Sequence, residues 1–114
     1  MTPKLYVLVR ADLPPGPRAV QACHAALQFA AEHNGTFHDW LRLSNYLIIK
    51  EAPDEPALHA VVERARLRGH KHSRFLEPDY GDSLTAVAIE PEGRSLCARF
   101  PLALAGVEIA KPAA

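Results

Sequence analysis

A short apolar segment, followed at once by a turn and a long glycine-free stretch, constrains the fold more than any other feature. Residues 5–9 are all apolar or aromatic, which is typical of a strand buried on both faces. Residues 13–16 contain two prolines and a glycine and predict a turn. From Pro17 to His33 there is no glycine, and Pro17 suits the first turn of a helix. A buried strand that leads directly into a helix favours an α/β fold.

The same alternation of apolar runs with Pro and Gly continues along the chain. The other predicted strands are residues 46–49, which we expect to be buried, 71–76 and 84–89, the last two joined by a turn at 78–82. The other predicted helices are a helix capped by Asp54 that continues to about Arg68 and ends at Gly69, and a last helix over 94–100. Residues 36–43 are expected to form one short helical turn, and residues 107–114 a short strand and tail. This order predicts a mixed sheet with helices packed on it.

Length and charge limit the functions that the chain can have. The 114 residues, 48% of them apolar, suit one compact domain over 1–114 that buries roughly two-thirds of its unfolded surface. Lys+Arg and Asp+Glu number 13 each, so a chain-wide basic field is excluded and any nucleic-acid binding needs a local patch. The two cysteines, and the lack of a secretory signal or of about 18 consecutive apolar residues, predict a soluble cytoplasmic protein without membrane contact.

Four polar side chains interrupt the small and apolar residues of the first predicted helix. Arg18, Gln21, His24 and Gln28 are spaced by 3, 3 and 4 residues and so form one polar stripe. The stripe is either the solvent side of the helix or the lining of a site. The second interpretation is favoured because the stripe begins at a helix N-terminus, directly after a strand, where anions and ligands bind. Cys23 projects about 100° from His24 and is predicted to be a small core residue.

Two further segments carry polar chemistry. The turn 77–85 combines three carboxylates with two hydroxyls, either as ordinary turn chemistry or as a carboxylate that orients a water beside a hydroxyl. Residues 64–74 contain five of the 13 Lys and Arg and no acid, which indicates either a solvated helix end or a phosphate-contacting patch. His70 and His72 lack an evident third ligand, so no metal site is predicted.

Two of these segments resemble the type-two peptidyl-tRNA hydrolase family. The first is the apolar strand that ends at Arg10, followed by Gly16 and the helix motif 21–26, in which Gln21 and His24 are three apart before small residues. The second is the strand 82–89, which is similar to the family's Gly-Thr-x-Thr strand. Element order and lengths agree between them, so the resemblance covers most of the chain.

The resemblance implies a three-layer α/β/α fold with a four-stranded mixed β-sheet. It also implies hydrolysis of the ester that joins a peptide to the 3′ end of tRNA, without a metal or another cofactor. Gln21 and His24 match the family's helix motif, and Ser83 and Thr85 match its hydroxyl strand. The family's lysines at the helix start are absent here, so that only Arg18 can supply this charge, and Asp79 is the counterpart expected for the family's acidic loop residue.

The function expected from these residues is that of a peptidyl-tRNA hydrolase-like enzyme. Asp79 and His24 would orient or deprotonate the attacking water, and Arg18, with the amides of the helix N-terminus, would stabilise the oxyanion or hold the terminal phosphate. The residues expected to bind substrate are Gln21, Ser83 and Thr85 at the site, and Arg64, Arg66, Arg68 and Lys71 on the tRNA backbone.

Two alternatives from other classes stay open at this point. One is a non-catalytic RNA- or protein-binding module on the same fold, and the other is a hydrolase of another small acyl ester or amide. The steepness of the salt dependence distinguishes them, because only binding through several phosphates weakens strongly with salt. The sequence also leaves open a homodimer formed through a sheet edge or a helix face.

Overall fold

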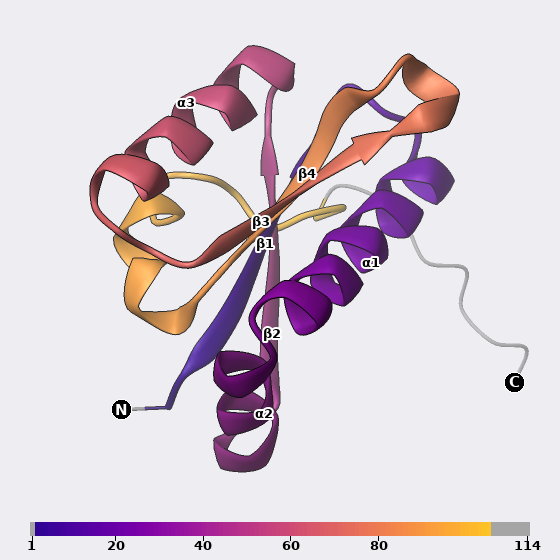
Figure 1. Ribbon diagram of the computed structural model, residues 1–114. Coiled ribbons are helices and arrows are strands. Elements are labelled where there is room, and N and C mark those ends of the chain that lie inside the picture. The colour runs from indigo at the N-terminus through magenta and orange to yellow at the C-terminus, as the bar shows by residue number, and fades with distance from the viewer. Residues whose placement is uncertain (1, 106–114) are drawn as a thin grey trace, which may run out of the picture.

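The computed structural model describes residues 2–105 and contains a four-stranded mixed sheet (Figure 1). Its strands are β1 (Lys4–Arg10), β2 (Tyr46–Ala52), β3 (His72–Glu77) and β4 (Ser83–Ile89). The spatial order is β2-β1-β4-β3, with β1 parallel to β2 and antiparallel to β4, and with β3 antiparallel to β4. This arrangement confirms the predicted α/β class and the mixed sheet, and it leaves β2 and β3 at the two edges.

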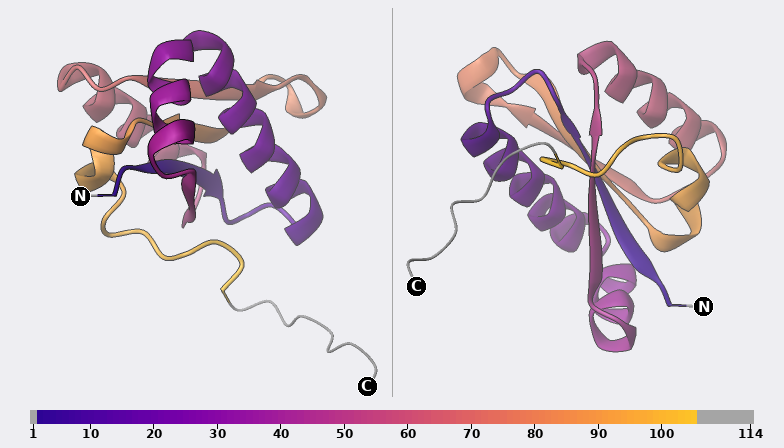
Figure 2. Two further views of the ribbon diagram at one scale, coloured as in Figure 1. Left: turned by 90° about the horizontal axis from the view of Figure 1, so that it is seen from below. Right: turned by 180° about the vertical axis from the view of Figure 1, so that it is seen from behind.

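Helices cover both faces of the sheet (Figure 2). On one face lie α1 (Pro15–Glu32) and α2 (Asn34–Leu43), whose Phe29 and Trp40 pack against Val7 and Val9 of β1. On the other lie α3 (Glu55–Leu67) and the 3-10 helix η2 (Pro91–Leu96), which pack around Leu8. Successive side chains of a strand point to opposite faces, so an apolar strand such as β1 supplies both cores. The expected three layers are therefore present.

The bounds of α3 follow from local chemistry, as predicted. The Asp54 side chain accepts a hydrogen bond from the backbone N–H of Ala57 at 3.0 Å, which satisfies one of the free donors of the first turn. After the helix, Gly69 has φ of +71°, a left-handed conformation that glycine adopts without a side-chain penalty. The chain can thus turn from α3 into β3.

Three expectations about secondary structure were wrong. Residues 36–43 belong to the ten-residue helix α2, because the burial of Trp40 stabilises more than one turn, and Asn34 begins this helix rather than ending α1. β2 extends to Ala52 but is an edge strand, with Tyr46 and Leu47 exposed, since β1 is its one partner strand among the described residues and residues 101–103 bridge its outer side only around Lys50. The last helix is the 3-10 helix η2 and not a helix over 94–100. The strand and tail expected over 107–114 lie outside the described residues.

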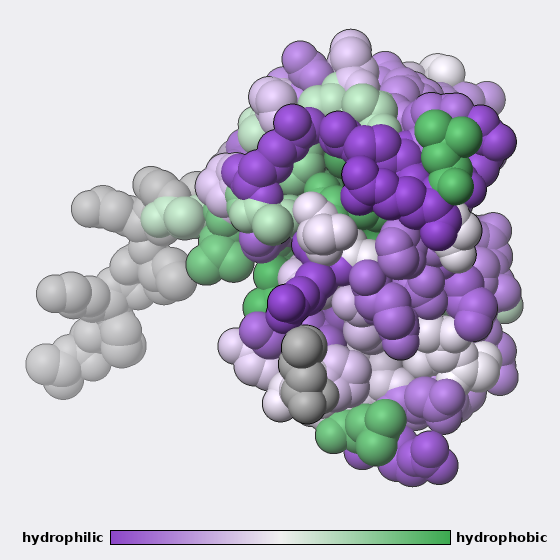
Figure 3. Space-filling model, turned by 90° about the vertical axis from the view of Figure 1, so that its left-hand side faces the viewer, coloured by the Kyte–Doolittle hydropathy of each residue, from purple (hydrophilic) through white to green (hydrophobic). Residues whose placement is uncertain are grey.

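The surface of the described residues is mainly polar on the face shown in Figure 3. Among residues 2–105, no helix is both long and apolar enough to cross a bilayer. The face on the side of α3 is largely hydrophilic, with separate hydrophobic side chains between the polar ones (Figure 3).

Cys97 is fully buried, and burial raises the pKa of its thiol to about 12, so this thiol stays protonated at neutral pH.

Candidate functional site

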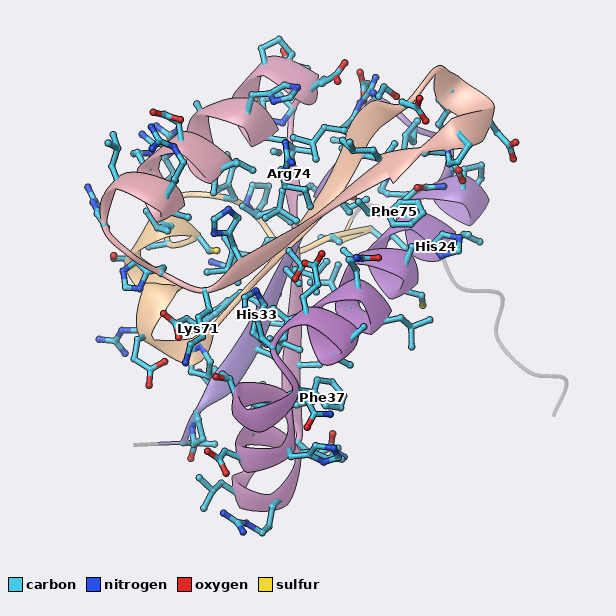
Figure 4. All side chains as sticks on the ribbon, in the orientation of Figure 1. His24, His33, Phe37, Lys71, Arg74 and Phe75 are labelled. Atoms are coloured by element: carbon cyan, nitrogen blue, oxygen red, sulfur yellow. The ribbon has the colours of Figure 1, made fainter. Side chains whose placement is uncertain are left out.

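Three residues of the polar stripe of α1, Gln21, His24 and Gln28, lie beside the edge strand β3. Helix and strand run side by side in opposite directions (Figure 4). Their contacts, in order along the helix, join Gln21 to Glu77, the ring of His24 to that of Phe75, and His33 to the backbone carbonyl of His72. The β3 side chains involved, at 75 and 77, are two residues apart and therefore share one face of the strand.

The opposite side of α1 carries the apolar residues that face solvent. Val20 and Leu27 are 51% and 69% exposed, and Cys23 is exposed between them, whereas Gln21 is only 2% exposed. The prediction of Cys23 as a core residue was therefore wrong, and the polar stripe is not the solvent side of the helix. The buried side of α1 is mixed, because Gln21 shares it with Ala22, Ala25 and Phe29, and Gln21 would be costly to leave unpaired there.

A chain of hydrogen bonds joins three residues of the site. The Thr85 hydroxyl donates to Gln21 Oε1 at 2.6 Å, and Gln21 Nε2 donates to Glu77 Oε1 at 2.8 Å. A carboxylate in its ionised form can only accept, so the amide group of Gln21 must face Glu77 and its oxygen must face Thr85. Within residues 2–105, Oε2 of Glu77 receives no hydrogen bond. This oxygen is thus free to bind a water or a substrate donor.

The ring of His24 is held by stacking. Its plane lies 8° from that of Phe75, with the ring centroids 4.4 Å apart. Neither ring nitrogen has a hydrogen-bond partner in the described part of the chain. A half-buried imidazole fixed in this way presents its nitrogens at the ring edge, where they can exchange a proton with a bound molecule.

The predicted acid, Asp79, lies apart from these contacts. It belongs to the 3-10 helix η1 (Pro78–Tyr80) at the tip of the β3–β4 hairpin, where it is exposed and forms no hydrogen bond or ion pair with a described residue. Glu77 is the carboxylate that accepts a hydrogen bond from Gln21, which in turn accepts one from Thr85, and sequence reasoning did not single it out. The predicted strand ended one residue before it, at 76. Extending that strand to Glu77, as in the structure, could have indicated it, because residues 75 and 77 of one strand face the same way.

Ser83 lies at the start of β4, in register with Glu77. Its hydroxyl accepts a hydrogen bond from Arg10 at 3.4 Å, and Arg10 in turn binds Asp12 through two hydrogen bonds of 2.9 and 3.0 Å. The hydrogen bond from Arg10 holds the pKa of the Asp12 carboxyl below its ordinary value. Arg10, which ends β1, is a second residue of this region that sequence reasoning did not assign a role.

Arg18 is occupied by contacts within the fold. Its guanidinium donates to the backbone carbonyls of Ala11 and Leu13 and forms an ion pair of 2.6 Å with Glu51 of β2. The two charged side chains are only 15% and 14% exposed. Arg18 therefore ties the turn before α1 to the neighbouring strand.

The N-terminus of α1 offers few free amides. Pro15 and Pro17 have no N–H, and the N–H of Arg18 already donates to the carbonyl of Pro14 at 2.9 Å. Of the four N–H groups that a helix start usually leaves free, Gly16 alone retains one. The anion-binding capacity expected at this position is accordingly small.

The predicted phosphate-contacting residues lie at the far end of β3 from Glu77. Arg64 and Arg66 belong to α3, Arg68 caps it, and Lys71 precedes β3. The six residues of β3 span about 20 Å at the usual rise of a strand. Arg66 is paired with Glu63 at 2.5 Å, and Lys71 donates to the hydroxyl of Thr36 at 3.1 Å, whereas Arg64 and Arg68 have no ion-pair partner in the described chain. These four residues are referred to below as the basic patch.

The two neighbouring histidines have structural contacts. His70 Nδ1 lies 3.2 Å from a carboxylate oxygen of Glu90, and His72 Nδ1 lies 2.9 Å from the backbone carbonyl of His70. No group of three or more His, Cys, Asp or Glu side chains between residues 2 and 105 is arranged to hold a metal ion.

Two of the hollows on the surface of residues 2–105 bear on the location of the site. A cavity of about 700 Å³ lies at the start of β1, beside Lys4, Tyr6 and Tyr46, and shares no residue with the contacts described above. A groove of about 420 Å³ lies between α1 and β3 and is lined by Gln28, Glu32, His72, Arg74, Phe75 and Leu76. The groove includes Phe75, on which His24 stacks. We therefore assign the smaller hollow, and not the larger one, to the candidate site.

The sequence matches a protein-family model over most of its length. The model of the family described as Peptidyl-tRNA hydrolase PTH2 matches residues 3–104, nearly the whole chain. No curated protein matches the chain. The matched span contains every residue of the polar stripe, of the hydrogen-bonded chain and of the basic patch.

Proposed function

Because the chain belongs to the peptidyl-tRNA hydrolase PTH2 family, we propose that it hydrolyses the ester between a peptide, or an N-acyl amino acid, and tRNA. The observation that carries this proposal is the α1–β3 contact, at which Gln21 bonds to both Glu77 and Thr85 while His24 stacks on Phe75, two residues before Glu77. These groups combine an uncommitted carboxylate oxygen with an imidazole, as water-mediated ester hydrolysis requires.

In this proposal a water binds between Glu77 and His24. A proton leaves the water for one of these two groups as its oxygen bonds to the ester carbonyl carbon, which gives a tetrahedral intermediate. The carbon then loses the ribose 3′-oxygen, which takes the proton back from that group, so that a free carboxylic acid and tRNA are released. Gln21 and Thr85, which are 2% and 0% exposed, fix the orientation of Glu77, and Ser83 contacts substrate. The competing assignment is the one predicted from the sequence, in which Asp79 orients or deprotonates the water.

Arg18 enters the proposal as a positioning residue. The sequence suggested contact with the oxyanion or the terminal phosphate, but four of its hydrogen bonds are directed to Ala11, Leu13 and Glu51. We propose that it fixes the turn between β1 and α1, and hence the start of the polar stripe. The homodimer, the cytoplasmic location and the single domain over 1–114 remain predictions.

The first test is single-turnover hydrolysis of an N-acetyl-aminoacyl-tRNA by the purified protein. We expect release of the N-acetyl amino acid, and a decrease of about 100-fold or more in His24→Ala, because positioned proton transfer contributes on this scale. His38→Ala serves as the matched control, since His38 is an exposed histidine of α2 outside the site. Binding of tRNA without hydrolysis would support the binding module instead, and cleavage of small acyl esters alone would support the other hydrolase.

The basic patch gives a second expectation, in the salt dependence. If Arg64, Arg68 and Lys71 each contact one phosphate, changing all three to Ala lowers the slope of log KM against log salt by about 2 to 3. Arg66→Ala is expected to change the slope least of the four single variants, because Glu63 already neutralises this side chain. An unchanged slope in the triple variant would remove the basic patch from tRNA binding.

A further inference from the structure

We propose that the open edge of β3 binds the peptide part of the substrate as an added strand. This inference rests on the proposed function and assigns a subsite within the same site. It concerns the backbone groups of Arg74 and Leu76 and the groove beside them, and it commits to an extended peptide chain as the occupant.

The backbone of β3 has one side without a partner strand. Strand order places β3 at the edge of the sheet, with β4 on its inner side only. The carbonyl of His72 points away from β4, as its contact with the ring of His33 of α1 shows. Since N–H and C=O groups alternate in direction along a strand, those of Arg74 and Leu76 also point outward. Between residues 2 and 105, no other strand pairs with them.

The groove beside this edge has the charge of a peptide site. Glu32 and Arg74 contribute one charge of each sign, and Gln28 adds a neutral amide. The pKa of Glu32 is held below its ordinary value by the nearby Ser73 hydroxyl and by the Gln28 amide, so this carboxylate is ionised. The Ser73 hydroxyl is buried, forms no hydrogen bond of standard geometry with residues 2–105, and acts on Glu32 as a nearby dipole. An ionised carboxylate repels phosphate, which favours a neutral chain over the tRNA backbone.

The open edge is continuous with the candidate site. Phe75 lies between Arg74 and Leu76 in the chain and stacks on His24 (Figure 4). Glu77 is the next residue after Leu76. A chain paired with Arg74 and Leu76 therefore ends beside the imidazole and the free carboxylate oxygen, where the ester would lie.

Backbone pairing also suits the proposed chemistry. An enzyme that acts on peptidyl-tRNA meets peptides of many sequences, which share only their backbone. Main-chain hydrogen bonds to a sheet edge recognise that backbone without regard to side chains.

The activity test compares three substrates on the same tRNA: a tetrapeptidyl ester, the same ester with N-methylated peptide amides, and an N-acetyl-aminoacyl ester. We expect kcat/KM to be about tenfold higher for the tetrapeptidyl ester than for either of the others, as for one or two added hydrogen bonds. Arg74→Pro removes the outward N–H and should abolish this preference, whereas Arg74→Ala retains the N–H and should preserve it. Thermal unfolding of both variants checks that the sheet is intact.

A binding test separates this inference from the proposed function. An N-acetyl tetrapeptide amide is added to the wild-type protein, and amide chemical shifts and hydrogen exchange are measured. Shifts and added protection at Arg74 and Leu76 are expected, and they would support the subsite even if the protein hydrolysed no tRNA ester. Equal kcat/KM for all three substrates, with no change at these amides, would overturn it, as would a dimer in sedimentation that covers this edge and excludes the peptide.

Discussion

Replacing Glu77 with glutamine is expected to lower the single-turnover rate on N-acetyl-aminoacyl-tRNA by about 100- to 1,000-fold, whereas Asp79→Asn should change it by less than about threefold. Both substitutions remove one negative charge with almost no change in size. Only Glu77 contacts Gln21, and only Glu77 lies on the face of β3 that also carries Phe75 and hence His24.

The physical reason is the environment of the two carboxylates. Oε1 of Glu77 is fixed by Gln21, which is itself fixed by Thr85, so Oε2 has a defined direction. A glutamine at position 77 can still accept the hydrogen bond from Gln21 through its amide oxygen, but it cannot take a proton from water. Asp79 is exposed at a hairpin tip and would have to be ordered by the substrate, which costs side-chain entropy.

The controls decide between the two assignments. Glu77→Gln should unfold within a few degrees of the wild type, since the hydrogen-bonded chain can persist, and its KM should change less than its rate. Gln21→Ala should show an intermediate loss, because Glu77 then keeps its charge without its orientation. A large decrease of the rate in Asp79→Asn, with a small decrease in Glu77→Gln, would show that Asp79 at the hairpin tip is the carboxylate that orients or deprotonates the water.

The sequence predicted the fold best where apolar runs and turn residues coincide. The buried strand β1, the cap at Asp54 and the stop at Gly69 depend on local chemistry, so they were recognisable. The helix α2 was predicted as one turn only, because Trp40 becomes buried through contacts with distant residues. The exposure of β2 depends on strand order, which no local pattern specifies.

The candidate site was predicted less completely, for a related reason. The stripe residues Gln21 and His24 were found because helical spacing relates them to each other. Glu77 joins them only through packing of α1 on β3, and Arg18 faces Glu51 only because β1 and β2 are neighbours. Helical spacing likewise indicates one polar and one apolar face for α1. It does not say that Gln21 is buried beside Ala22, Ala25 and Phe29 while Val20 and Leu27 lie in solvent.

Replacing Arg18 with alanine is expected to lower the free energy of unfolding by about 2 to 3 kcal/mol and Tm by about 10 °C. The variant loses the ion pair with Glu51 and the hydrogen bonds to Ala11 and Leu13, and it leaves a carboxylate that is only 14% exposed. Glu51 keeps one donor, the backbone N–H of Leu104 at 2.8 Å, which limits the cost. Thermal and urea unfolding measure both quantities.

Glu51→Gln provides the matched control, because it breaks the same ion pair from the side that cannot bind phosphate. If Arg18 is a positioning residue, Glu51→Gln and Arg18→Ala should both lower stability, the double variant should be less destabilised than the sum of the single ones, and the salt slope of KM should match the wild type. Arg18→Lys should recover only part of the stability, since an ammonium cannot reach Glu51 and two carbonyls in the planar geometry of a guanidinium. A stable Arg18→Ala variant with a raised KM and a reduced salt slope would instead assign Arg18 to the terminal phosphate of the tRNA.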